Sequence, residues 1–183
     1  MIIRETALAK VAVIETQPFV DERGSFARWF CRNELSTVLG DFSIVQINQS
    51  ITRKAGTIRG MHFQRPPFAE MKLVRCLKGQ VFDVALDLRA GSKTFGHWHA
   101  ELLTPENARM LVIPEGCAHG FQALTDDVEL LYLHTAPYQP DYEAGALFND
   151  PAFAIQWPLA CVEISEKDAR YASIMDDFRG ITV

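Results

Sequence analysis

One histidine, two arginines and one lysine lie in two short neighbouring segments of this chain. His62 stands in residues 59–64 (RGMHFQ), which begin with Arg59, and Lys72 opens residues 72–75 (KLVR). Arginine and lysine side chains bind anionic groups, and an imidazole takes up and releases a proton near neutral pH. The stretch therefore predicts a site that holds an anionic substrate and moves a proton on it.

A second histidine and a tyrosine extend this chemistry to inversion of a carbon beside a ketone. His119 lies in residues 114–121 (PEGCAHGF), between turn glycines. A proton beside a ketone becomes acidic when a donor such as Lys72 stabilises the enolate oxygen, and His62 fits the general base. The phenol of Tyr138, with an ordinary pKa of about 10, is the expected acid on the opposite face. A carboxylate should orient the base, but sequence order does not identify it.

Short apolar segments bounded by turn residues must position these side chains. They predict strands over residues 42–51, 71–77, 81–88, 98–103, 109–113 and 128–134. Such spacing is typical of an antiparallel sandwich or barrel, so the expected fold class is all-β. In residues 81–88, Asp83, Ala85 and Asp87 share one face by alternation, and this polar face is expected to line a cavity.

A few short helices complete the prediction. One is expected over residues 31–39, with Asn33 or Ser36 as its cap and Gly40 where it stops. Another is expected to open at Ser165, a plausible N-cap.

Composition favours one globular domain covering residues 1–183. A net charge of -5 argues against nucleic acid as the main partner. No apolar run approaches the roughly 20 residues of a membrane span, so no membrane partner and a cytoplasmic location are expected. The cysteines form no CxxC pair and are expected to be free thiols; they are Cys31, Cys76, Cys117 and Cys161.

Residues 114–119 also resemble the second conserved box of the cupins, which are small jelly-roll barrels. Metal-binding cupins combine this box with an earlier HxH motif and a glutamate. Here His97, His99 and Glu101 fall on one strand face, a metal triad by alternation. This face follows a glycine-rich turn and is expected to meet solvent, so the sequence favours a site without metal or cofactor.

The whole chain resembles the dTDP-4-dehydrorhamnose 3,5-epimerase family, from residues 21–26 to the C-terminal segment. Besides the segments above, the matching motifs are 45–48 (VQIN), 83–87 (DVALD), 138–143 (YQPDYE), 150–151 (DP), 157–158 (WP) and 165–168 (SEKD). The resemblance implies a cupin-type jelly roll and a homodimer whose subunits exchange strands and base-binding residues.

The resemblance also implies a role for each matching residue. His62 would be the base, Asp168 its partner, Tyr138 the acid and Lys72 the group that steadies the C4 oxygen. The implied substrate is a nucleotide diphosphate 4-keto-6-deoxyhexose, inverted at C3, C5 or both. The residues expected to bind it are Arg23 and Arg59 at the diphosphate, His119 at the sugar, Phe26 and Gln46 at the base, and Asn48, Glu143 and Arg28.

One departure concerns the nucleotide base. The family has a glutamate where this chain has Arg28. A carboxylate accepts the N3–H of thymine, whereas a guanidinium only donates and would suit the acceptors of cytosine. A cytidine diphosphate sugar is therefore an alternative substrate, and Arg28 turned to solvent or phosphate is the simpler reading. Residues 51–57 add positive charge near the expected mouth of the site.

Four other functions remain open from the sequence. A C3-only epimerase and a 3,4-ketoisomerase would use the same barrel, on a dTDP- or CDP-sugar. A non-catalytic sugar-binding cupin and a metal-dependent dioxygenase belong to different classes. The chain retains all four residues to which the resemblance gives a role in the reaction, and this favours an active epimerase. They are His62, Lys72, Tyr138 and Asp168.

Overall fold

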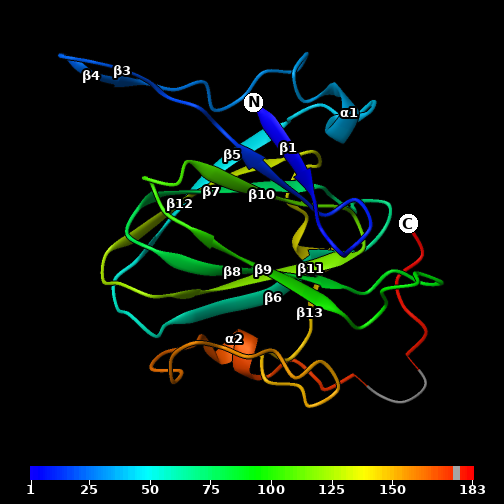
Figure 1. Ribbon diagram of the computed structural model, residues 1–183. Helices are drawn as coiled ribbons and strands as arrows, with labels where there is room; N and C mark the ends of the chain where they lie inside the picture. The colour runs from blue at the N-terminus through cyan, green and yellow to red at the C-terminus, as the bar shows by residue number, and fades with distance from the viewer. Residues whose placement is uncertain (175–177) are drawn as a thin grey trace.

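Two facing antiparallel β-sheets form the centre of the computed structural model, which describes residues 1–174 and 178–183 (Figure 1). The six-stranded sheet has the order β1 (Ile2–Glu5), β2 (Ala12–Glu15), β10 (Arg109–Ile113), β7 (Lys72–Lys78), β12 (Val128–His134) and β5 (Gln46–Thr52). The five-stranded sheet has the order β13 (Glu143–Gly145), β6 (Ile58–Gln64), β11 (Cys117–Ala123), β8 (Val81–Asp87) and β9 (Trp98–Leu103). The predicted all-β jelly-roll sandwich is confirmed.

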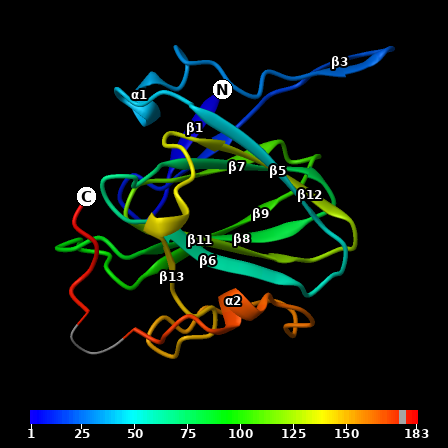
Figure 2. The same ribbon diagram turned by 180° about the vertical axis from the view of Figure 1, so that it is seen from behind.

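The inner faces of the two sheets build the main core. Because side chains alternate along a strand, β7 directs Val74 and β8 directs Ala85 into this core, where Phe121 of β11 also packs. Val84 and Leu86 point to the outer face of the five-stranded sheet. The long segment after β13 covers that face, as Figures 1 and 2 show beneath the sheet.

The helices are short. Helix α1 (Ser36–Leu39) is shorter than the predicted helix over residues 31–39, and neither Asn33 nor Ser36 caps it with its side chain. Packing of Leu35 and Leu39 against the outer face of the six-stranded sheet stabilises this single turn, which is too short to be stable by itself. Gly40 ends the helix as predicted, with a φ of 53°. A further turn of 3-10 helix, η1, covers Pro140–Tyr142.

Helix α2 (Glu166–Ala169) begins as the sequence predicts. The Ser165 hydroxyl accepts a hydrogen bond of 3.0 Å from the backbone N–H of Asp168. In residues 1–174 and 178–183, no helix has the length and apolarity needed to span a membrane.

A hairpin of β3 (Phe19–Asp21) and β4 (Gly24–Phe26) stands out from the sandwich, and we call it the arm. Figures 1 and 2 both show it extending away from the two large sheets. All of its strand residues are exposed, and Phe19 and Phe26 are 80% and 72% exposed. The arm is therefore an apolar surface with no partner among the described residues.

Candidate active site

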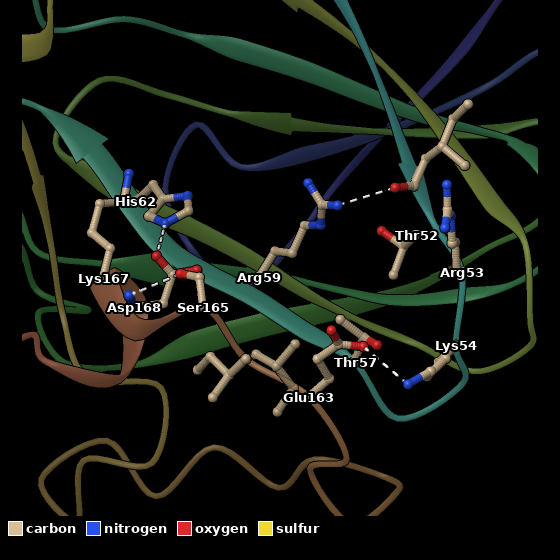
Figure 3. Close-up of a pocket in the computed structure, with 13 residues that line it drawn as sticks. Thr52, Arg53, Lys54, Thr57, Arg59, His62, Glu163, Ser165, Lys167 and Asp168 are labelled. Atoms are coloured by element: carbon tan, nitrogen blue, oxygen red, sulfur yellow. Dashed lines mark hydrogen bonds and ion pairs between the residues drawn. The ribbon is translucent and has the colours of Figure 1, made fainter.

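A cavity of about 290 Å³ lies between the two sheets and takes its walls from both. The six-stranded sheet contributes Gln46, Asn48, Gln49, Ser50, Lys72, Tyr132 and His134. The five-stranded sheet contributes Arg59, His62, Phe63, Gln64, His119, Phe121 and Glu143, and connecting segments add Glu70 and Tyr138. Arg59 and His62 also line an adjoining groove of about 750 Å³, which the close-up in Figure 3 shows.

His62 and Asp168 form a tight pair at the border of the cavity and the groove. The His62 Nε2 and Asp168 Oδ1 atoms are 2.7 Å apart. A dashed line marks this contact in Figure 3. The other oxygen of Asp168 accepts from the backbone N–H of Gly60 at 3.1 Å. Burial favours the neutral acid, but the hydrogen bonds and the His62 ring outweigh it and lower the pKa of Asp168. The carboxylate is thus fixed as an acceptor for the imidazole.

Lys72 lines the same cavity. Its Nζ atom is 3.3 Å from Oε1 of Glu70 and 3.4 Å from the backbone oxygen of His62. The Lys72 side chain is only 11% exposed. A buried cation in this position can donate to an oxygen that develops negative charge.

Tyr138 lies on the surface, in the segment that follows β12, and is 50% exposed. Its hydroxyl donates to Glu143 at 2.8 Å, and this hydrogen bond raises the pKa of Tyr138. Its backbone N–H donates to the side chain of Gln46 at 3.0 Å. These contacts place Tyr138 at the mouth of the cavity.

A second tyrosine stands deeper between the sheets. Tyr132 is on β12 and lines the same cavity as His62, which is on β6 of the other sheet, and its hydroxyl is 3.0 Å from the Ser50 hydroxyl. Burial strongly raises the pKa of the Tyr132 phenol. The ring of His119 meets the Tyr132 ring edge-on, with centroids 6.0 Å apart. His119 is itself held by Asp83, at 2.7 Å.

The structure therefore brings most of the predicted site residues together. The predicted residues that line the one cavity are Gln46, Asn48, Arg59, His62, Lys72, His119, Tyr138 and Glu143, and Asp168 lines the adjoining groove.

Three predicted substrate contacts lie elsewhere in the chain. Arg23 and Phe26 are in the arm, and Arg28 follows it. The Arg28 guanidinium donates to Glu34, which also accepts from the N-terminal ammonium group. The three residues border neither the cavity nor the groove, so one described chain does not complete the predicted substrate site.

Three titratable residues of the cavity were given no role in the site by sequence reasoning: Glu70, Tyr132 and His134. It assigned no chemical role to His134, whose Nδ1 lies 2.7 Å from Glu70. The alternation of side chains along β12 could have identified Tyr132 and His134. Leu130, Tyr132 and His134 share one face of the strand, and this face becomes polar toward the end of the strand.

A metal centre does not form among residues 1–174 and 178–183, where no three suitable side chains lie close together. Within the candidate triad, Nε2 of His99 is 3.6 Å from Glu101, and Glu101 also pairs with Arg109.

The comparisons with known proteins agree on one family. The family model described as dTDP-4-dehydrorhamnose 3,5-epimerase matches residues 5–176. The dTDP-4-dehydrorhamnose 3,5-epimerase of Salmonella typhimurium is 44% identical, over 92% of this chain and 93% of its own length.

Two solved structures add information on ligands and variants. The dTDP-6-deoxy-D-glucose-3,5-epimerase of Legionella pneumophila, in complex with dTDP-4-keto-L-rhamnose, superposes with a TM-score of 0.87 and 41% identity, covering 91% of this chain and 89% of that one. A 3'-monoepimerase of Streptomyces bikiniensis, in complex with dTDP, has a TM-score of 0.86 and 27% identity, covering 93% and 86%. That protein is a double mutant whose replaced histidine and tyrosine lie 70 positions apart.

Proposed function

The chain belongs to the dTDP-4-dehydrorhamnose 3,5-epimerase family, and on this premise we propose that His62 and Tyr132 epimerise the sugar from opposite sides. The protein is an isomerase that inverts stereocentres beside the ketone of a nucleotide diphosphate 4-keto-6-deoxyhexose. One observation carries the assignment of these two residues: they come from facing sheets and line the same cavity. A hexose ring between the sheets would meet the imidazole on one face and the phenol on the other.

His62 removes the proton. Because the Asp168 carboxylate can only accept, Nε2 of His62 carries the hydrogen that joins the pair. Nδ1 is then the unprotonated nitrogen and takes the proton from C3 or C5. The electron pair of the broken C–H bond forms the carbon–carbon double bond of an enolate, whose negative charge moves to the C4 oxygen.

Lys72 stabilises that oxygen. Its largely buried ammonium group lies in the cavity beside the backbone of His62. A preorganised donor of this kind strengthens its interaction as negative charge develops, and it lowers the barrier for that reason.

Tyr132 returns a proton to the other face of the enolate, and Tyr138 binds at the mouth. Both phenols have a raised pKa and are protonated at neutral pH, so position distinguishes them. Tyr132 stands between the sheets, whereas Tyr138 is exposed. His62 and Tyr132 are also 70 positions apart, the separation of the histidine and tyrosine replaced in the 3'-monoepimerase double mutant. Our proposal thus moves the acid from Tyr138, the residue expected from the sequence, to Tyr132.

The arm completes the nucleotide site of a second copy of the chain. Arg23 and Phe26 stand exposed on it, and β5 is the last strand of its sheet, with Ile47 and Ile51 both more than half exposed. An apolar arm and an apolar edge strand suit a homodimer in which each arm reaches the neighbouring cavity. Arg23 would then bind the diphosphate and Phe26 the base, beside Gln46 and Asn48.

Incubation in heavy water with dTDP- and CDP-linked 4-keto-6-deoxyglucose tests the function. NMR should show deuterium entering C3 and C5 of at least one substrate, with inversion of both centres. Deuterium at C3 alone would identify a C3-only epimerase. No deuterium from either substrate would contradict the proposed reaction.

A further inference from the structure

A third pair of histidine and carboxylate opens into the cavity, besides the pairs of His62 and His119. His134 Nδ1 lies 2.7 Å from Oε2 of Glu70. Both residues are almost fully buried, with 8% and 9% of their surface exposed. A carboxylate buried to this extent is strongly unfavourable unless charged or donating groups compensate it. The partners of Glu70 therefore indicate what the pair does.

The hydrogen bonds of His134 fix its protonation. On its far side, Nε2 lies 3.3 Å from Nδ2 of Asn48, an amide nitrogen that can only donate. Nε2 of His134 must accept, so the ring proton is on Nδ1 and is donated to Glu70. The imidazole is neutral in this arrangement, and the negative charge of Glu70 remains.

Lys72 is the cation that balances this charge. Oε1 of Glu70 is 3.3 Å from its Nζ atom. Burial favours the neutral form of Glu70, but His134 and Lys72 outweigh it and lower the pKa of this carboxyl. Hydrogen bonds and an ion pair thus run without interruption from Asn48 through His134 and Glu70 to Lys72.

Strand register fixes the geometry of this chain of contacts. His134 pairs directly with Lys72 on β7 and with Gln46 on β5. Glu70 precedes Lys72 by two residues. Three neighbouring strands therefore hold Asn48, His134 and Lys72, and Glu70 lies in the segment that leads into β7.

We propose that Glu70 and His134 are positioning residues, which hold the ammonium group of Lys72 directed at the C4 oxygen; this rests on the role of Lys72 proposed above. A lysine side chain has four rotatable bonds, and other acceptors lie within the same cavity. Glu70 restricts the ammonium group to one place, and His134 in turn restricts Glu70. The other titratable and charged groups that face this cavity are Arg59, His62, His119, Tyr132, Tyr138 and Glu143.

Glu70→Gln tests the proposal because it retains the size of the side chain and removes the charge. We expect kcat to fall by on the order of 10²-fold, as for a misplaced catalytic group, with KM nearly unchanged. Glu70→Asp retains the charged partner of Lys72 and should restore most of the lost kcat. KM should stay near the wild-type value in both variants, because the proposed role concerns the transition state rather than substrate binding.

Glu101→Gln is the matched control, because Glu101 also faces a histidine but lies on β9, away from the cavity. It should leave both kcat and KM unchanged. Thermal unfolding checks that each variant is folded. Deuterium exchange into the substrate by the wild type is measured in the same experiment. Deuterium exchange by the wild type together with an unchanged kcat in Glu70→Gln would overturn this inference alone. No exchange by the wild type would contradict the proposed function itself.

Discussion

Two Asp-x-Arg units make the same hydrogen bonds in opposite surroundings. In the arm, Asp21 accepts from the backbone N–H and the guanidinium of Arg23. At the end of β8, Asp87 accepts in the same way from Arg89. The side chain of Asp21 is 52% exposed, whereas that of Asp87 is 0% exposed.

The difference separates a fixed region from an adaptable one. Asp87 also accepts from the hydroxyls of Ser92 and Thr94, so its unit is locked into the sandwich. Among the described residues, the Arg23 side chain contacts only its exposed aspartate, and it can exchange that partner for a phosphate at little cost. We infer that the sandwich fixes the chemistry within one chain, while the arm captures the nucleotide.

The largest expected effect tests the fixed region. His62→Ala should lower kcat by roughly 10²- to 10⁴-fold, because it removes the general base. Deuterium exchange from heavy water, followed by NMR, measures the loss. Binding of dTDP, measured by calorimetry, should change little. Exchange at the wild-type rate would show that another group removes the proton.

The two Asp-x-Arg units give the next comparison. Asp87→Asn should lower the free energy of unfolding by about 3 kcal/mol, because it leaves Arg89 without its partner in a nearly buried site. Asp21→Asn should give no measurable change. Urea unfolding of both variants checks the contrast, and equal losses would remove the distinction between the regions.

The same pair predicts a pH dependence. Hydrogen bonds from Arg89, Ser92 and Thr94 outweigh the effect of burial and lower the pKa of Asp87 in the folded state. The contribution of Asp87 to the free energy of unfolding is therefore complete above the unfolded pKa of about 4 and is lost as the pH falls below that value. We expect the free energy of unfolding, measured between pH 6 and 2, to fall less in Asp87→Asn than in the wild type.

Phe26 tests the arm. Phe26→Ala should raise KM by roughly tenfold and leave kcat almost unchanged, because stacking on a base contributes about 1–3 kcal/mol. Steady-state kinetics separate the two constants. A fall in kcat with an unchanged KM would show that the arm takes part in the chemistry.

The smallest expected effect concerns the choice of base. We compare kcat/KM for the dTDP-linked substrate with kcat/KM for the CDP-linked substrate. Arg28→Glu should raise the ratio of the first to the second by about fivefold, which corresponds to one hydrogen bond. Glu34→Gln, which frees Arg28 from its partner, should shift the ratio the other way. An identical ratio in the wild type and in both variants would show that Arg28 does not contact the base.

Local patterns in the sequence predicted much of the sandwich. The expected strands over residues 81–88, 98–103, 109–113 and 128–134 match β8, β9, β10 and β12 closely. Alternation and turn residues are local signals, and they were sufficient there. The helix over residues 31–39 was too long because contacts of Leu35 and Leu39 with a distant sheet, rather than local capping, decide its extent.

The site was predictable only where one segment carries its own signal. His62 and Lys72 stand out within short motifs. The contact of Glu70 with His134 depends on which strands become neighbours. The shared cavity of Tyr132 and His62 depends on which strands face each other. Residues 64 or 70 positions apart carry no local sign of such contacts.

The most direct test of the account compares Tyr132→Phe with Tyr138→Phe in heavy water, with label and configuration both read by NMR. Tyr132→Phe should still exchange the proton that His62 removes but should not invert the centre, whereas Tyr138→Phe should invert it. The opposite result, with inversion retained in Tyr132→Phe and lost in Tyr138→Phe, would contradict a reaction carried out between the two sheets.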